Sequence, residues 1–303
     1  MASQSQLAAQ AATGHTSSAG VRARRIAVNL VFYALMAAIA LIFMAPLLWM
    51  VTASLKPERL VLSIPPDFIP RYFQIENYAE VLEVIPLFLY NSFKLAFLSV
   101  GGTLFVTSLA AYAFARLNFW GRDFAFSVLL STLMVPGIVT LIPLYIIYRQ
   151  MPGWLGGLPG SGWIDTHYPL WVPRVLHSVF AIFLLRQFFK QIPMELEDAA
   201  KVDGANTFQI YWRIMLPQVK PALAAVGIFS FLESWNDLFG PLIYLNSIRL
   251  QTLPIALKLF QGEFFSQVNV LMAGATISII PVLVIFFAAQ KYFLKGIVMT
   301  GIK

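Results

Sequence analysis

Long apolar stretches separated by short polar segments dominate the hydropathy pattern of this chain. A helix needs about 20 consecutive, predominantly apolar residues to cross the hydrocarbon core of a membrane. Six stretches reach or approach that length, and charged residues inside them are few. The pattern therefore predicts an all-α polytopic membrane protein with six transmembrane helices, at about residues 27–53, 88–115, 124–148, 169–189, 222–244 and 268–290.

The composition supports this interpretation. Of the 303 residues, 59% are hydrophobic and 12% are charged, whereas a soluble domain has about 45–50% apolar and about 25% charged residues. So much apolar sequence also excludes a disordered chain. The chain has no cysteine and only three widely separated histidines, so disulfides and thiolate metal sites are excluded. We therefore expect no metal site and no catalytic group.

The positions of Lys and Arg predict how the helices are oriented. If both termini are cytoplasmic, 13 of the 21 basic residues fall on the cytoplasmic side, as the positive-inside rule requires. The net charge of +7 then follows from topology and gives no reason to expect a nucleic-acid partner. We expect residues 1–25 to be a disordered cytoplasmic N-terminus and residues 26–303 to be a lipid-embedded domain. In this orientation Arg174 and His177 lie near the outer membrane interface.

The longest predicted cytoplasmic loop, residues 190–221, is polar but has a helical pattern. Acidic residues begin its first helix, where the helix dipole favours them, and Gly204 can end that helix by adopting a positive φ. Asn206 or Thr207 can cap a second short helix, which Pro217 ends. The loop therefore predicts a compact helix–turn–helix, which taken alone fits a structured connector between two spans.

Seven positions of this loop follow the pattern D-A-A-x-x-x-G-x9-I-x-L-P, which begins at Asp198. The pattern resembles the E-A-A-x-x-x-G-x9-I-x-L-P loop of permease subunits in binding-protein-dependent ABC importers. Asp198 stands where that family usually has Glu, and Glu197 precedes it. Two other segments, residues 54–57 (SLKP) and 110–116 (AAYAFAR), resemble the carbohydrate, maltose-type branch of the family. The resemblance covers roughly residues 27–300.

This resemblance implies a type I ABC importer permease fold in a bacterial or archaeal plasma membrane, with the loop as a coupling helix. It implies a second permease subunit, two ATPase subunits and an extracytoplasmic solute-binding protein as partners. The chain has no G-x-x-x-x-G-K-[ST] phosphate-binding loop. We therefore expect it to bind no cofactor and to be no enzyme, with ATP and Mg²⁺ on the ATPase partners. The implied ATPase-coupling residues are Glu197, Asp198, Ala199, Ala200, Asp203, Gly204, Ile214, Leu216 and Pro217.

Two carboxylates interrupt the predicted fifth span. Glu233 and Asp237 are four residues apart and so share one face of a helix, with Trp235 and Asn236 beside them. Ionisable residues within spans are costly and point to function. In a carbohydrate path, carboxylates and amides can hydrogen-bond hydroxyl groups, and aromatic rings can stack on sugar rings. Hydrogen bonding between helices or between subunits is the alternative for these four residues.

Three functions fit parts of the pattern. An ion-coupled secondary carrier would use Glu233 and Asp237 as its ion site, but such carriers usually have internal repeats and broken helices, and the chain has no repeated halves. A membrane scaffold would explain only the helices. The importer also explains the cytoplasmic motif. We therefore expect a permease subunit that couples ATP hydrolysis to alternating access for a carbohydrate, either a di- or oligosaccharide or a polyol-type solute.

Overall fold

The chain folds as a bundle of helices, and its computed structural model describes residues 3–65, 67–70, 72–260 and 267–299. Within those residues, all regular structure is helical apart from one isolated bridge between Leu158 and Gly162. Four helices are long and apolar enough to cross a membrane, and six spans result if each of two bent helix pairs is counted as one. The predicted all-α polytopic architecture is therefore confirmed.

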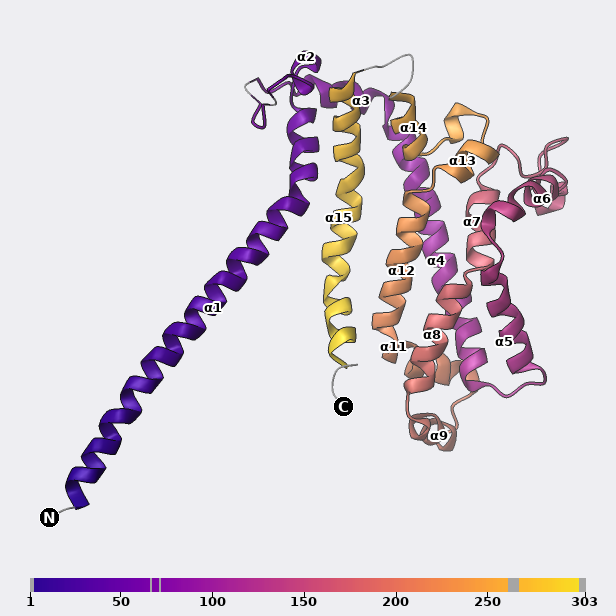
Figure 1. Cartoon of the computed structure of the whole chain (residues 1–303). Coiled ribbons are helices and arrows are strands. Elements are labelled where there is room, and N and C mark those ends of the chain that lie inside the picture. Colours follow the sequence, from indigo (N-terminus) through magenta and orange to yellow (C-terminus); the bar gives the residue numbers. More distant parts are fainter. Residues whose placement is uncertain (1–2, 66, 71, 261–266, 300–303) are drawn as a thin grey trace.

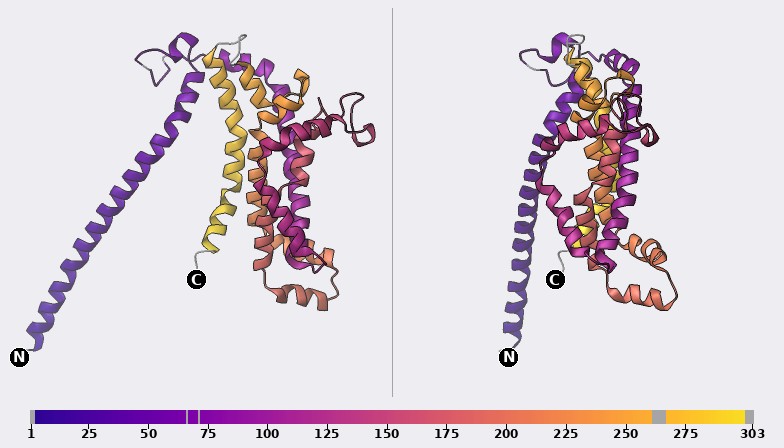
Figure 2. Two further views of the ribbon diagram at one scale, coloured as in Figure 1. Left: turned by 45° about the vertical axis from the view of Figure 1, so that its right-hand side comes forward. Right: turned by 90° about the vertical axis from the view of Figure 1, so that its right-hand side faces the viewer.

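Three predicted spans are continuous helices: α1 (Ser3–Ser54), α4 (Pro86–Arg116) and α15 (Val268–Met299) cover the first, second and sixth. α4 packs against both α12 and α8 inside the bundle (Figure 1). α1 contacts α15 near one end and then diverges from the other helices (Figure 2). No residue in the most apolar window of α1 is buried. Lipid or another chain must therefore cover this surface.

The N-terminal segment differs from the expectation. Residues 3–20 are helical and form the beginning of α1, whereas the sequence predicted disorder over residues 1–25. This segment is rich in Ala and Gln, which are good helix formers, and it extends an existing helix, so it needs no separate nucleation. Residues 1–2 and 300–303, the two ends of the chain, lie outside the described residues.

The third predicted span, 124–148, is sharply bent. α5 (Arg122–Ser131) leads through the short turn η1 (Thr132–Met134) to α6 (Gly137–Arg149), and the two halves meet at 102°. Pro136 causes this bend because it has no N–H and disfavours helical backbone in the residue before it. Val135 accordingly adopts an extended conformation.

The fourth span consists of α7 (Tyr168–Leu176) and α8 (Val179–Gln191). The predicted fifth span, 222–244, is wrong at its second end, because α12 (Lys220–Trp235) stops nine residues earlier and α13 (Phe239–Tyr244) is a separate helix. Pro241 lies within α13, so it is not the residue at which α12 ends. The remaining short elements are α2 (Glu58–Val61), α3 (Glu76–Val84), α14 (Leu253–Phe260), η2 (Gly153–Leu155) and η4 (Ile248–Leu250).

The polar loop between α8 and α12 forms one end of the bundle, which we call the α9 end. It contains α9 (Met194–Val202), α10 (Thr207–Gln209), the π-helical turn η3 (Ile210–Met215) and α11 (Leu216–Gln218). The predicted helix–turn–helix is thus present. α1 begins and α15 ends toward this same end (Figure 1). The first residue of α1, Ser3, and the last residue of α15, Met299, therefore lie on the side of the predicted coupling loop.

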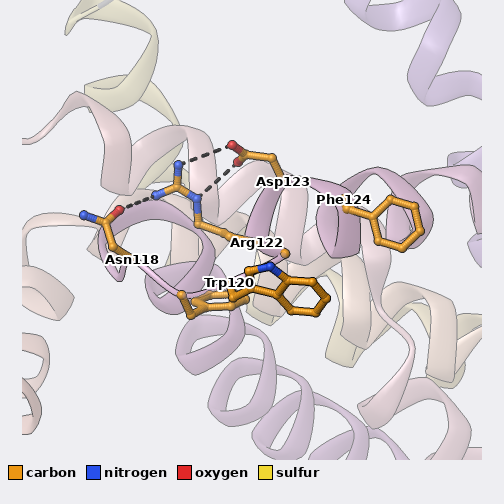
Figure 3. Close-up of a pocket in the computed structure, with 7 residues that line it drawn as sticks. Asn118, Trp120, Arg122, Asp123 and Phe124 are labelled. Atoms are coloured by element: carbon orange, nitrogen blue, oxygen red, sulfur yellow. Dashed lines mark hydrogen bonds and ion pairs between the residues drawn. The ribbon is translucent and has the colours of Figure 1, made fainter.

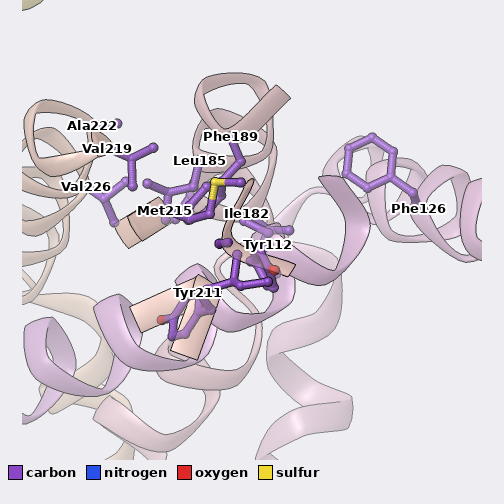
Figure 4. Packing of buried hydrophobic residues seen from close by; sticks show 14 residues of the cluster. Tyr112, Phe126, Ile182, Leu185, Phe189, Tyr211, Met215, Val219, Ala222 and Val226 are labelled. Carbon is purple, nitrogen blue, oxygen red and sulfur yellow. The ribbon is translucent and has the colours of Figure 1, made fainter. Parts of the chain in front are cut away.

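A buried hydrophobic cluster joins the α9 end to the membrane helices (Figure 4). Tyr112 of α4, Leu185 and Phe189 of α8, and Tyr211 and Met215 of η3 all belong to it. The rings of Tyr112 and Tyr211 lie 5.2 Å apart, centroid to centroid. The cluster also includes residues of α5, α9 and α12, so it packs the segment that follows α9 against the membrane helices.

Candidate functional site

The turn after α9 is held by backbone and side-chain hydrogen bonds. Gly204 adopts φ +80°, the left-handed conformation that glycine adopts without strain. The N–H of Ala205 donates to the carbonyl of Ala200 at 2.9 Å, which closes the helix end. Asn206 and Gln209 then form a capping box, in which each side chain accepts the backbone N–H of the other. The predicted helix-ending conformation of Gly204 and the predicted capping by Asn206 are confirmed.

α9 projects from the bundle with most of its surface exposed. Between Met194 and Gly204, only Glu197 and Ala200 are buried. Asp198, Ala199 and Asp203 face outward, and the apolar side chain of Val202 is 88% exposed. A nine-residue helix is marginal in isolation, so α9 depends on its contacts with the bundle and with whatever covers its outer face.

The second half of the motif lies inward. Ile214 and Leu216 pack against the buried cluster of Figure 4, and Pro217 lies beside them at the protein surface. The hydroxyls of Tyr211 and Ser108 share a hydrogen bond of 2.7 Å between η3 and α4. The helical segment up to Gln218 meets α12 at 80°. The motif therefore contains an exposed part on α9 and a packed part that connects α4 with the start of α12.

Arg116, the last residue of α4, lies beneath α9. Its guanidinium donates to the carbonyl of Phe189 from Nη2 at 2.6 Å and from Nε at 3.1 Å, and it also contacts Ile192 O and Met194 Sδ. Its Nη1 lies 4.0 Å from Oε2 of Glu197, and both side chains are almost completely buried. Arg116 is not among the coupling residues predicted from the sequence. The sequence feature that could have identified it is its place at the end of the segment 110–116, which resembles the same family.

The two neighbouring carboxylates of α9 also share a cation. Lys201 lies 3.1 Å from Oε1 of Glu197 and 3.6 Å from Oδ1 of Asp198. The hydrogen bond and the charge of Glu197, and then the charge of Asp198, raise the pKa of Lys201 above its ordinary value. Lys201 therefore stays protonated and partly neutralises this acidic turn.

The loop between α4 and α5 forms a second surface feature at the α9 end, a hollow of about 500 Å³ lined by residues 118–124 (Figure 3). Arg122 donates to Oδ1 of Asn118 at 3.0 Å and pairs with Oδ1 of Asp123 at 3.1 Å. Trp120 is fully exposed on its rim. Because Arg122 is already paired within this loop, we assign no binding site to the hollow.

A larger cavity, of about 830 Å³, lies between α6, α7, α12 and α13. Arg174 of α7 reaches two carboxylates there: its Nε lies 3.4 Å from Oε1 of Glu233, and its Nη2 lies 3.1 Å from Oδ2 of Asp237. Tyr148 and Tyr244 also line this cavity. Arg174 is therefore the partner of both acids, which the sequence did not predict.

Glu233 and Asp237 differ in their surroundings. Asp237 lies beyond the end of α12 and not on a continuous helix with Glu233, which corrects the predicted shared helical face. Its Oδ1 accepts the N–H of Gly240 at 2.9 Å, and a Cβ at Gly240 would lie 2.5 Å from Oδ2. The side chain of Asp237 is 19% exposed, whereas that of Glu233 is 65% exposed. Glu233 thus presents a carboxylate to the cavity, and Asp237 is held in the wall.

Trp235 and Asn236 do not line the cavity. Trp235 is buried, with its ring against Phe93 and Phe231, and its Nε1 donates to the carbonyl of Ser278. Residues two positions apart in an α-helix point in directions about 200° apart around its axis, so Trp235 faces away from Glu233. Asn236 is exposed and bonds back to Leu232. The predicted path role of Trp235 is therefore replaced by a packing role between α12, α4 and α15.

The two regions offer different chemistry. The α9 end presents an exposed acidic helix, which suits contact with a protein, and its one buried carboxylate, that of Glu197, faces Arg116 at 4.0 Å. The cavity presents carboxylate, guanidinium, imidazole and phenol groups, which suit hydrogen bonds to a polar solute. Within the described residues, no three His, Asp or Glu side chains lie close enough together to hold a metal ion.

Comparison with known proteins identifies relatives over most of the chain. The arabinooligosaccharides transport system permease protein of Bacillus subtilis (strain 168) is 32% identical over 284 residues, which cover 92% of this chain and 96% of the relative. The lactose transport system permease protein of Rhizobium radiobacter is 31% identical over 274 residues, which cover 90% and 96%.

Solved structures share the fold. A chain of a bacterial ABC transporter involved in the import of the acidic polysaccharide alginate matches with a TM-score of 0.71 at 24% identity, over 88% of this chain and 96% of that chain. A family model described as the inner membrane component of binding-protein-dependent transport systems matches residues 103–298. The resemblance seen in the loop motif is thereby confirmed, and the chain belongs to the family of binding-protein-dependent transport system inner membrane components.

Proposed function

We propose that this chain is the membrane-spanning permease subunit of an ATP-driven carbohydrate importer. The observation that carries the proposal is α9, an exposed acidic helix that bears the family motif and projects from one end of a transmembrane bundle. Relatives that serve transport systems for arabinooligosaccharides and lactose support a carbohydrate substrate. The solute is a di- or oligosaccharide or a polyol-type molecule.

In this proposal the α9 end is cytoplasmic, and both termini lie on that side. α9 docks on an ATPase subunit, and Asp198, Ala199, Val202 and Asp203 form its contact face because they are exposed. Asp198 pairs with a basic residue of the ATPase. ATP and Mg²⁺ bind to two such ATPase subunits, and this chain binds no cofactor and performs no catalysis. A second permease subunit and an extracytoplasmic solute-binding protein complete the importer.

The cavity beside Arg174 is the proposed contribution of this chain to the solute path. A carboxylate that is 65% exposed, that of Glu233, can accept hydrogen bonds from sugar hydroxyls. Asp237 orients Arg174, and the rings of Tyr148 and Tyr244 supply apolar faces. The positive charge of Arg174 is offset by two carboxylates, which favours neutral, hydroxyl-rich solutes over anions.

The test is reconstitution of the complex in proteoliposomes after purification of the chain with its neighbours from native membranes. We expect an ATPase and a second permease to co-purify, and ATP hydrolysis to rise when the binding protein and the cognate carbohydrate are added. We expect the Asp198→Ala variant to lose most of this stimulation. A chain that purifies alone and transports a solute with an ion gradient and no ATP would overturn the proposal in favour of the carrier.

A further inference from the structure

Two arginines join the ends of α4 and α8 at the α9 end. Arg116 of α4 donates to the carbonyls of Phe189 and Ile192 at the end of α8. In the opposite direction, Arg186 of α8 donates to the carbonyl of Phe114 near the end of α4 at 3.2 Å. The last carbonyls of a helix have no partner within it. Each helix therefore donates hydrogen bonds to carbonyls at the end of the other, and these bonds join α4 and α8 into one rigid unit there.

Arg116 also reaches α9. Five donor hydrogens in a planar fork let one guanidinium bond to carbonyls and face a carboxylate at the same time. Its Nη1 lies 4.0 Å from Oε2 of Glu197, the buried acidic residue of α9. Arg116 thus lies at the junction of three helix ends.

The Arg116–Glu197 pair is not closed in this structure. A charge-assisted N–H···O bond spans about 2.7–2.9 Å, so the pair is open by about 1 Å. Oε2 of Glu197 is buried and has no hydrogen-bond partner among the described residues. The hydroxyl of Tyr112, one helical turn before Arg116 on α4, is likewise buried and without such a partner in the described part of the chain. Unpaired buried polar groups are costly, so a small shift of α9 toward α4 is favoured by new bonds.

We propose that Arg116 is the positioning residue through which movement of α9 is passed to α4 and α8. A displacement of α9 toward the bundle closes the Arg116–Glu197 bond, and the α4–α8 unit then moves with α9. The inference rests on the proposed function, because it needs α9 to be the helix that an ATPase moves. It assigns separate roles to neighbouring carboxylates: Asp198 contacts the ATPase, and Glu197 passes the movement inward.

The experiment compares Arg116→Lys, Arg116→Gln and Glu197→Gln in the reconstituted complex. Arg122→Gln is the matched control, because Arg122 belongs to an ion pair at the same end that does not involve α9. Solute uptake and ATP hydrolysis are measured on the same proteoliposomes. We expect the variants to keep their ATPase subunits and to hydrolyse ATP within about twofold of the parent, while uptake per ATP falls at least tenfold. Arg122→Gln should keep the parental ratio.

A second measurement detects the movement itself. The chain has no native cysteine, so Val202→Cys on α9 and Trp120→Cys after α4 can carry two spin labels at exposed positions. In the parent, we expect ATP to change the distance between the labels by no more than the movement of about 1 Å that closes the Arg116–Glu197 bond. In the Glu197→Gln variant, we expect a larger change with ATP, because α9 then moves without α4.

Three results would count against these proposals, and they can be told apart. Parental uptake per ATP in both Arg116→Gln and Glu197→Gln would overturn the inference. Loss of the ATPase subunits from both Arg116→Lys and Glu197→Gln would also overturn it, because the pair would then serve only to shape the docking surface. If the parent chain itself binds no ATPase, the proposed function fails before the inference is reached.

Discussion

Glu197 and Asp198 are adjacent in the sequence, but the side chain of Glu197 is 5% exposed beside Arg116 and that of Asp198 is 66% exposed on the outer surface of α9. Successive residues of a helix are about 100° apart, so one carboxylate faces the bundle and the next faces away. The family motif begins at Asp198, and its exposure makes it the carboxylate that is available to another protein.

Alanine substitutions of Glu197 and Asp198 should have different effects on stability and on ATPase binding. Asp198→Ala should leave the thermal stability of the purified chain within about 0.5 kcal/mol of the parent, as exposed substitutions usually do, and should weaken binding of the ATPase. Glu197→Ala should destabilise the chain by about 1–3 kcal/mol, because it removes the carboxylate that faces the buried charge of Arg116. Thermal unfolding in detergent and ATPase pull-down measure the two effects. Equal effects of the two substitutions on stability would contradict this assignment.

We expect Gly204 to be required for uptake because its backbone is left-handed, and not because a side chain would lack room at this position. A Cβ at this position would meet no atom within 4 Å, but φ is +80°. Gly204→Val should therefore strain the turn by about 1–2 kcal/mol or more and abolish uptake while the chain still inserts. Gly204→Asn is the control, because Asn tolerates left-handed backbone better. Normal uptake by the Val variant would contradict the requirement.

Substitutions of the two acidic residues that line the cavity, Glu233 and Asp237, should differ in their effects on stability and on solute affinity. Asp237→Asn should lower stability by about 1–3 kcal/mol, because it weakens a largely enclosed pair with Arg174 and affects the bond to Gly240. Glu233→Gln should change stability little, because its side chain is well exposed and such pairs contribute about 0–1 kcal/mol. Its effect should instead be on the apparent affinity for the solute. Uptake kinetics of both variants check this, and unchanged kinetics for Glu233→Gln would assign Glu233 to packing.

Trp235 is expected to act through packing. Trp235→Ala should cost about 3–5 kcal/mol, whereas Trp235→Phe should cost about 1 kcal/mol, the usual net value of the lost hydrogen bond to Ser278. Thermal unfolding measures this difference. Because Trp235 does not line the cavity, Trp235→Phe should leave the KM for uptake unchanged. A clear change in KM without a loss of stability would restore Trp235 to the solute path.

Two adjacent glycines of α4 provide a test of helix packing. A Cβ at Gly102 would lie 2.4 Å from Cγ2 of Val175 on α7, whereas a Cβ at Gly101 would meet nothing within 4 Å. Gly102→Ala should destabilise the chain by about 1–3 kcal/mol through overpacking. Gly101→Ala should be neutral or stabilising, because Ala is the better helix former. Thermal unfolding compares the two, and the second substitution Val175→Ala should rescue Gly102→Ala.

The sequence by itself determined the features that depend on interactions within one short segment of the chain. Hydropathy over 20-residue stretches identified the six regions that can lie in a membrane, because a helix satisfies its backbone groups within one segment. Gly204 and the capping residue Asn206 were predictable for the same reason, since both act within one or two turns. The loop motif identified the family, because its fixed spacing lies within a single short segment.

The tertiary structure decided which charged groups meet. Arg174 and Asp237 are 63 positions apart, and Arg116 meets Glu197 only because α4, α8 and α9 end at one place. It also decided that α12 ends at Trp235 and that the third span bends at Pro136, since hydropathy records whether residues are apolar and not whether their helix is continuous. Pairing between distant residues depends on how helices pack, and no local pattern in the sequence contains that information.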